Sequence, residues 1–580
     1  MRLVRGKRLL AVLLGLFLLA PAALTPAPAA EPSSPVLNAL QKELTRSFQK
    51  LKNSGEAPLY YLSYSLYDVE RNSMSAHYGA LEDTPYPTRS MKLRVNVRVG
   101  DQHIDNTHKM RRSSFSFSRS SAFNWFGSSM PAEPEEYAIR SVLWQKTDEA
   151  FKEAEQRFLS VKANKDVSVE DEDTSDDFSQ EKSHAFVGSS PKSTVDMTQW
   201  QNRIRELSKI YKKYPEILNS DVSFVMTRVR RYMVASDDTR LQDDHTEFRF
   251  ATTAEATADD GMRVWLYDSV EVPNYTDIPD EPKLAEMVEH LAQSVKDLRQ
   301  AQKAEPYVGP AILQAKAAGV FFHETFGHRI EGNRQKDEEE GRTFAKKVGH
   351  QIMPNFITVI DDPTIHNLGT KPLHGYYSFD DEGIPAQKVT LVENGTLKGF
   401  LMGRSPVRGF PASNGHGRGA PGNDPVARQG NLIVKSSKRV PYAELRKMLI
   451  EEAKKQGKPY GLVFDEIAGG FTLTSTWLPQ VYRLLPLRVT RVYTDGRPDE
   501  LLRGVNIVGT PLASLENILA AADDDAVFNG TCDAESGPVP VSACAPSLLV
   551  QTIEVERQDK STDKPPILPP PAHDKGGAAK

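Results

Sequence analysis

The chain is organised around residues 321–332, which have the sequence FFHETFGHRIEG. In this stretch His323 and His328 flank the carboxylate of Glu324 inside an otherwise apolar run. The residues before it begin at Pro310 and are mostly alanine and aliphatic, which predicts a largely buried helix that continues through both histidines. Two imidazoles and a carboxylate in such a helix suit a site where a metal ion activates water, although two ordinary helix histidines would give the same pattern.

The spacing of the two histidines leaves two arrangements open. The histidines of an HExxH zinc motif lie four residues apart, about 40° around a helix, whereas five residues place them about 140° apart. A π-bulge, made easier by Gly327, would turn His323 and His328 toward one ion. Alternatively, Glu324 and His328 are the ligand pair. We expect the two histidines to be the ligands, because Glu324 is then free to act as a general base.

The first 30 residues predict a signal peptide. Basic residues at positions 2–8 precede a short apolar run at 9–20, and small residues at 27–30 supply a cleavage site. We therefore expect an exported protein, periplasmic or secreted, with a retained N-terminal anchor as the alternative. No later stretch approaches ~18 uninterrupted apolar residues, so no stable membrane insertion is expected after cleavage. The net charge of −5 is small for this length and does not indicate a nucleic-acid-binding protein.

Composition and periodicity divide the remaining chain into two folded regions. Residues 31–304 combine amphipathic helices with alternating strands, which predicts helices packed on an antiparallel sheet. Within them, residues 167–194 are acidic and serine-rich and are expected to form a loose insertion. Residues 305–556 are rich in glycine and in strands and carry the histidine helix, and residues 557–580 are expected to be disordered. The predicted fold class is α+β with two domains, of which the β-rich C-terminal domain carries the metal-binding helix.

Individual elements follow from the same patterns. The expected strands are 59–68, 73–78, 91–99, 222–234, 248–253, 262–269, 356–360, 388–392, 397–402, 431–434, 460–464, 480–490 and 548–555. The expected helices are 35–52, 135–162, 198–214, 283–302 and 442–455. The turn at Glu393-Asn394-Gly395 predicts a hairpin between two of these strands.

A third metal ligand has to come from elsewhere in the chain. A catalytic zinc usually has three protein ligands and one open position, so two histidines leave one ligand to find. Cys532 is a candidate because a thiolate binds zinc well. The chain has one other cysteine, Cys544, and two cysteines so close together in an exported protein also predict a disulfide. Composition leaves both the thiolate and the disulfide open.

Several segments resemble the TldD/PmbA family of metallopeptidases. They are residues 323–332, 380–385, 391–401, 413–418, 530–532 and 539–542, in the order in which they occur in the family. PmbA-type members lack the HExxxH residues, so this chain is similar to the TldD type. The resemblance implies that His323, His328 and Cys532 bind zinc and that Glu324 is the catalytic base. It also implies unfolded peptide substrates bound as an added β-strand, and a PmbA-like partner subunit or a homodimer.

Other interpretations of the same sequence remain. A non-catalytic peptide-binding or assembly subunit of the same fold is the alternative function, and an amidase or deacetylase is a third. Glu331 is a candidate for orienting a histidine ligand from behind, or is a surface carboxylate at the helix end. His374, His416 and Arg418 are candidates for stabilising a tetrahedral intermediate, or they hold glycine-rich loops.

Overall fold

The computed structural model describes residues 34–82, 87–110, 128–131, 133, 135–165, 173–188, 195–336, 340–474, 480–558 and 568. The predicted signal peptide of residues 1–30 therefore lies outside the described residues, as does nearly all of the expected tail at 557–580. No helix in the described part of the chain combines the length and the apolar composition that a membrane crossing requires.

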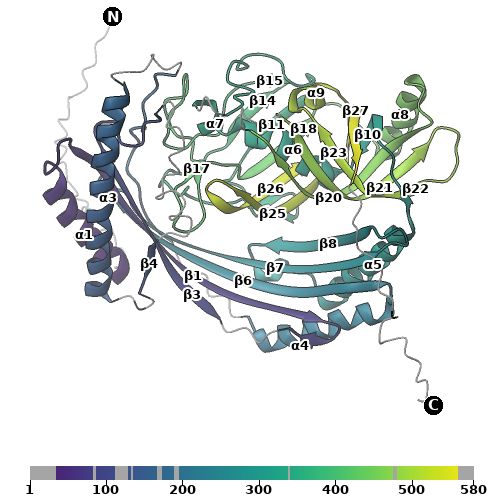
Figure 1. The fold of residues 1–580 in the computed structure, drawn as a ribbon, viewed down its shortest axis with the longest axis horizontal. Coiled ribbons are helices and arrows are strands. Elements are labelled where there is room, and N and C mark those ends of the chain that lie inside the picture. Colours follow the sequence, from purple (N-terminus) through teal and green to yellow (C-terminus); the bar gives the residue numbers. More distant parts are fainter. Residues whose placement is uncertain are drawn as a thin grey trace, which may run out of the picture.

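The N-terminal region is built on a twisted eight-stranded sheet that runs beneath the C-terminal region in Figure 1. The strand order is β4-β3-β1-β6-β7-β5, with β2 paired to β1 and β8 paired to β7. The strands are β1 (Leu59–His77), β2 (Ala80–Leu81), β3 (Thr88–Val99), β4 (Ser128–Met130), β5 (Ala185–Val187), β6 (Ile217–Ala235), β7 (Arg240–Thr257) and β8 (Arg263–Val272). The strands predicted separately at 59–68 and 73–78 form one strand, because β6 pairs with β1 without interruption from Ser63 to Ala76.

Helices cover this sheet near both of its ends (Figure 1). They are α1 (Pro35–Leu51) and α3 (Glu136–Lys165) at one end, and α4 (Met197–Ser208), the 3-10 helix η1 (Lys209–Lys213) and α5 (Glu281–Gln300) at the other. On β6, Phe224 packs with α4 and α5, whereas Tyr232 and Val234 pack with α1 and α3. These positions share one face because side chains alternate along a strand. On the opposite face Arg231 donates a hydrogen bond to the carbonyl of Phe379 (3.1 Å), so this face meets the C-terminal region.

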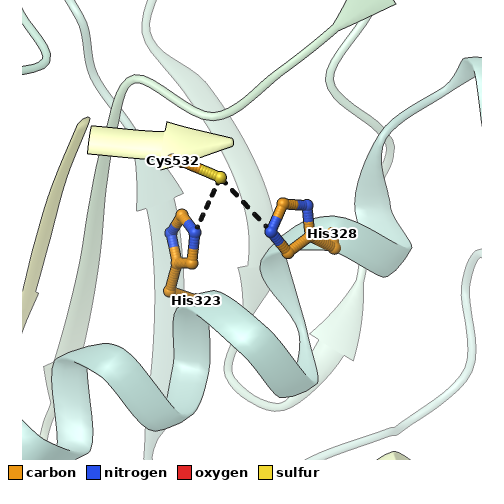
Figure 2. A group of neighbouring side chains, drawn as sticks. All are labelled: His323, His328 and Cys532. Atoms are coloured by element: carbon orange, nitrogen blue, oxygen red, sulfur yellow. Dashed lines mark hydrogen bonds between the residues drawn. The ribbon is translucent and has the colours of Figure 1, made fainter. Parts of the chain in front are cut away.

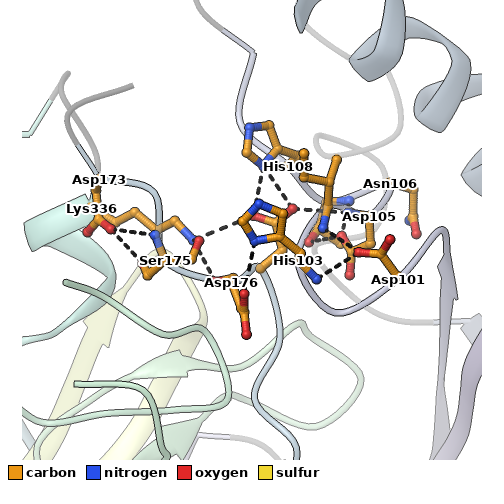
Figure 3. A network of polar contacts seen from close by, with 12 residues as sticks. Asp101, His103, Asp105, Asn106, His108, Asp173, Ser175, Asp176 and Lys336 are labelled. Carbon is orange, nitrogen blue, oxygen red and sulfur yellow. Dashed lines mark hydrogen bonds and ion pairs between the residues drawn. The ribbon is translucent and has the colours of Figure 1, made fainter. Parts of the chain in front are cut away.

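Residues 173–188, called the strap from here on, tie the two regions together. Phe178 in the strap is buried, and β5 pairs in parallel with β7. Lys336 of the C-terminal region donates a hydrogen bond to the backbone oxygen of Asp176 (2.8 Å), and His103 of the N-terminal region contacts the Asp176 carboxylate (3.0 Å; Figure 3). The loose insertion was predicted for residues 167–194, of which 167–172 and 189–194 lie outside the described residues. For the strap the prediction is wrong, because its acidic and serine residues bond to groups from both regions.

The C-terminal region contains two larger sheets with the histidine helix between them. The nine-stranded sheet has the order β19-β24-β27-β10-β20-β21-β22-β9, with β23 paired to β21 and β27, and the six-stranded sheet has the order β15-β14-β11-β18-β26-β25. The strands are β9 (Gln302–Lys303), β10 (Tyr307–Leu313), β11 (Ile357–Asp361), β12 (Asn367–Leu368), β13 (Lys371–Pro372), β14 (Val389–Glu393), β15 (Thr396–Leu397), β16 (Gly417–Arg418), β17 (Val426–Ala427), β18 (Asn431–Ser436), β19 (Arg439–Val440), β20 (Tyr460–Thr472), β21 (Tyr482–Tyr493), β22 (Glu500–Arg503), β23 (Val505–Gly509), β24 (Ile518–Ala522), β25 (Ala526–Ala534), β26 (Gly537–Ala545) and β27 (Leu548–Arg557). The helices are α6 (Ala315–Thr325), η3 (Gly327–Ile330), α7 (Asn333–Lys336), α8 (Tyr442–Lys455) and α9 (Pro511–Glu516). Helix α6 contacts β20 of the larger sheet and β25 and β26 of the smaller one.

Three local predictions can be compared directly with this region. The helix expected from Pro310 begins at Ala315 instead, because Pro310 lies in β10, at a bulge in the pairing with β27 where its missing N–H is tolerated. The hairpin turn is confirmed, since Asn394 and Gly395 both have positive φ (48° and 79°). The strand expected at 397–402 is wrong beyond β15, because Leu401 pairs with the histidine segment instead and its N–H bonds to the carbonyl of Ile330 (3.0 Å). The α+β class with two domains is the observed architecture.

Candidate metal centre

The histidine helix breaks between its two histidines. Helix α6 ends at Thr325, Phe326 has φ −114° and ψ −51°, and the 3-10 helix η3 begins at Gly327. The predicted π-bulge is therefore wrong, because the change to a tighter 3-10 turn redirects His328 in its place. A Cβ at position 327 would lie 1.9 Å from Oε1 of Gln429, so a larger residue than glycine here would require the Gln429 side chain to move.

The structure brings the three predicted ligands together in a buried cluster (Figure 2). Nε2 of His323 lies 3.2 Å from Sγ of Cys532, and Nε2 of His328 lies 3.3 Å from the same sulfur. Cys532 comes from β25, about two hundred residues further along the chain. A tetrahedral metal with bonds of about 2.3 Å to sulfur and about 2.0 Å to nitrogen separates such atoms by about 3.5 Å. The cluster thus fits one ion, and it contains both histidines rather than the pair of Glu324 and His328.

The two cysteines do not form a disulfide. Both are free and buried. In the pairing of β25 with β26, Cys532 lies opposite Val539 and Cys544 lies opposite Val527. Positions 527 and 532 are about 16 Å apart along a strand at ~3.3 Å per residue, well beyond the ~7 Å limit for Cα atoms joined by a disulfide. The sulfur of Cys532 is therefore available to the histidines.

Charge interactions inside the cluster favour the thiolate. Burial opposes ionisation of the Cys532 thiol, but the imidazoles of His328 and His323 outweigh it and hold its pKa well below the usual range. Burial also opposes protonation of His328, yet Cys532 and Glu331 raise the pKa of this histidine well above its ordinary value. A metal ion takes the place of the protons in such a cluster, since it needs a thiolate and neutral imidazoles.

A buried carboxylate holds the second histidine in place. Nδ1 of His328 lies 3.2 Å from Oε1 of Glu331, which has no exposed surface. Nε of Arg334 donates a hydrogen bond to Oε2 of the same carboxylate (2.8 Å). Burial raises the pKa of Glu331, but His328, Arg334 and Arg428 outweigh it and bring the value to about 2. The prediction that Glu331 orients a histidine is confirmed, because its contact with Nδ1 leaves Nε2 directed at the sulfur.

Glu324 faces the same cavity as the three predicted ligands. The cavity has a volume of about 470 Å³ and is also lined by residues 468–472 of β20 and 531–534 of β25. Burial raises the pKa of Glu324 above its ordinary value, with the nearby thiolate adding to the rise and the histidines opposing it. A Cβ at Gly470 would lie 3.0 Å from Cγ of Glu324, so glycine at this position leaves room for the carboxylate side chain. The arrangement suits a base beside a metal-bound substrate.

Three other residues named from the sequence lie away from this cavity. Nε2 of His416 lies 3.3 Å from Oδ1 of Asp361. Arg418 packs over the ring of Tyr377, 4.7 Å from its centroid. His374 is buried and lines no part of the metal cavity. His416, Arg418 and His374 do not line the metal cavity, so the structure gives no support to their interpretation as stabilisers of an intermediate. The sequence pattern missed Arg334 and Arg428, which belong to no recognisable motif.

Comparisons with known proteins agree with this geometry. Residues 306–557 match the family described as PmbA/TldA metallopeptidase C-terminal domain. A metalloprotease of Archaeoglobus fulgidus is 28% identical over 240 residues, which are 41% of this chain and 51% of that protein. A zinc metalloprotease TldD homolog of Saccharolobus solfataricus is 25% identical over 265 residues, 44% of this chain and 54% of that protein. The matched part thus spans about half the length of these curated relatives.

The fold has a counterpart among solved structures. TldE from Thermococcus kodakarensis superposes with a TM-score of 0.55 at 14% identity, over 89% of this chain and 99% of that one. This likeness shows a common two-domain fold. Together with the sequence matches, it supports a PmbA/TldD metallopeptidase-like domain in the C-terminal region.

Proposed function

We propose that this chain is a zinc-dependent peptidase that hydrolyses unfolded peptides or protein segments. The observation that carries the proposal is the cluster of His323, His328 and Cys532, with Glu324 in the same buried cavity. Two imidazoles and one thiolate are a donor set that zinc prefers, and a fourth position would face the cavity. The relative from Saccharolobus solfataricus is described as a zinc metalloprotease, which supports the same metal.

The residues around the cluster have separate tasks in this proposal. Bound zinc would polarise the scissile carbonyl and make a water molecule nucleophilic at neutral pH. The Glu324 carboxylate accepts the proton of that water and returns it to the leaving amine. Its raised pKa suits this role, because a base works best when its pKa lies nearer the working pH. Glu331 keeps Nε2 of His328 directed at the metal by holding Nδ1.

The edge of the N-terminal sheet supports an extended peptide as the substrate. Within the described residues β8 pairs with no strand but β7, so its other edge could take an added strand outside the part covered by Asn529, which donates a hydrogen bond to the backbone oxygen of Glu271 (3.1 Å). Residues 267–272 of β8 line a second cavity of about 250 Å³. Ala468 and Phe528 line both this cavity and the metal cavity, so the two are neighbours. A peptide added along β8 would therefore run toward Glu324.

The proposal includes the location of the enzyme and its partner subunit. The basic and apolar residues at the start of the chain support export, so we propose a periplasmic or secreted enzyme. A PmbA-like subunit or a second copy of the chain is the proposed partner.

The test is the substitution Glu324→Gln in the full chain. We expect about one zinc per chain by elemental analysis, as in the wild type, and a 10²–10⁴-fold lower kcat/KM on an unfolded reporter peptide, the usual size of a general-base effect. Glu452→Gln is the control, because Glu452 is a mostly buried carboxylate on α8 that contacts Gln456. Full activity of the Glu324 variant would exclude its role as base. A wild-type chain without zinc would favour the non-catalytic peptide-binding subunit.

A further inference from the structure

The side chain of Arg428 is fully buried beside the metal centre. It follows β17, and its backbone N–H donates a hydrogen bond to the carbonyl of His416 (2.9 Å). Burying a guanidinium is strongly unfavourable unless its donors find hydrogen-bond partners. The position of those partners therefore indicates what the arginine does.

One side of the guanidinium holds the hairpin that carries the cysteine ligand. Nη2 of Arg428 donates to the backbone oxygen of Cys532 (2.8 Å). Nη1 donates to Oγ of Ser536 (2.7 Å) and to the carbonyl of Gly537 (3.0 Å), which lie where β25 turns into β26. Three acceptors on one hairpin are thus bonded to one planar group.

The other side of the guanidinium faces the histidine segment. Nε of Arg428 lies 3.7 Å from Oε1 of Glu331. The same carboxylate oxygen contacts Nδ1 of His328 at 3.2 Å. One arginine therefore connects the strand of Cys532 to the residue that orients His328, although these two ligands lie 204 positions apart in the sequence.

We propose that Arg428 is a positioning residue that preorganises Cys532 and His328 for the metal, an inference that rests on the proposed zinc site. Helix α6 already packs against β25, and Arg428 adds a fixed link between the backbone of Cys532 and the carboxylate that contacts His328. Without this link the metal would have to order more of the local geometry itself, and this ordering would weaken binding. Arginine suits the task because its five donors lie in one plane in a fixed fork. Lysine keeps the charge next to Glu331 but is a point charge that cannot bridge both segments.

Arg418 provides a matched control in the same part of the fold. It is also buried, and it lies on β16, the strand that pairs with β17. Its guanidinium donates to the carbonyl of Gln429 and packs on Tyr377. Its side chain lines no part of the metal cavity. A general effect of a buried Arg→Lys change should therefore appear equally at Arg418.

The experiment measures metal binding by the full chain rather than activity. Zinc affinity of wild type, R428K and R418K is determined by competition with a chromophoric chelator, and the Co²⁺-loaded chains are compared by the intensity of the thiolate-to-cobalt absorption. We expect R428K to bind zinc about 10–100-fold more weakly, the range for residues that support metal ligands, with a weaker cobalt–thiolate absorption. R418K should lose much less zinc affinity than R428K, because the groups that Arg418 contacts, the carbonyl of Gln429 and the ring of Tyr377, are neither metal ligands nor Glu331.

Each outcome bears on the proposal. R428K with wild-type zinc affinity and an unchanged cobalt spectrum overturns the role of Arg428 and leaves the zinc site intact. A wild-type chain that binds neither metal overturns the proposed function and this inference with it. If R428K does not fold, Ser536→Ala replaces it, because it removes one of the two hairpin acceptors of Nη1 and leaves all ligands in place. Weaker zinc binding by S536A supports the link, and wild-type affinity overturns it.

Discussion

Substitution of Phe178 in the strap should loosen the connection between the two regions. The ring lies between the guanidinium groups of Arg98 on β3 and Arg404 in the C-terminal region, with centroid distances of 3.8 and 3.9 Å. It also packs on Tyr61, with ring centroids 4.8 Å apart. Replacing a core phenylalanine by alanine lowers the free energy of unfolding by about 3–5 kcal/mol. Each desolvated cation–π contact that is lost contributes up to about 2 kcal/mol. We therefore expect Phe178→Ala to destabilise the docked strap by about 4 kcal/mol.

Hydrogen exchange of the strap amides measures this loss directly. The N–H of Ser179 bonds to the carbonyl of Arg404 (2.9 Å), so its protection reports docking of the strap. A loss of about 4 kcal/mol corresponds to about a 10³-fold fall in protection, at 1.4 kcal/mol for each factor of ten. Phe186→Ala is the control, because Phe186 in the same strap is 37% exposed. A fall of less than about fivefold in the Phe178 variant, near 1 kcal/mol, would refute the reasoning.

Two further predictions concern the cysteines. Cys532→Ser should abolish stoichiometric zinc binding while the fold is retained, because a neutral hydroxyl replaces the thiolate. Elemental analysis measures the zinc content. A variant that still carries one zinc per chain would show that Cys532 is not a ligand. Burial raises the pKa of Cys544 to about 12, and the carboxylates of Asp361 and Asp525 add to the rise. Its thiol should therefore stay protonated as the pH rises from 7 to 9, with about one thiolate in 10³ at pH 9. Mass spectrometry after alkylation should find Cys544 unmodified in the native chain and modified after unfolding, and rapid native labelling would contradict the burial argument.

Periodicity was sufficient for the elements whose pattern is local. The apolar steps at three and four residues in α1 and the strict alternation in β3 require no distant partner to be recognised. The Asn394-Gly395 turn is equally local, since it depends on two residues that adopt positive φ. Where pairing with a distant strand decides the conformation, the same reasoning failed, as it did at Pro310 in β10.

The candidate site also has a part that local sequence patterns predict and a part that depends on contacts between distant segments. The residue types and their order in the chain were enough to name His323, Glu324 and His328 as candidates, because two imidazoles and a carboxylate in an apolar helix suit a metal site. The spacing of Cys532 and Cys544 in the sequence could not decide whether Cys532 is a free thiolate or forms a disulfide. It depends on the register of β25 against β26, which separates the two cysteines and turns Cys532 toward the histidines.

What the sequence determined by itself is therefore the chemistry of the centre, namely two imidazoles, a carboxylate and a candidate thiol, together with the α+β class of the fold. What only the tertiary structure decided is how these groups meet. The end of α6 at Thr325, the contact of Glu331 with His328, and the position of Arg428 between two distant segments all depend on packing. The physical reason is that local pattern fixes the preference of each residue, whereas the geometry of a metal site depends on contacts between segments far apart in the chain.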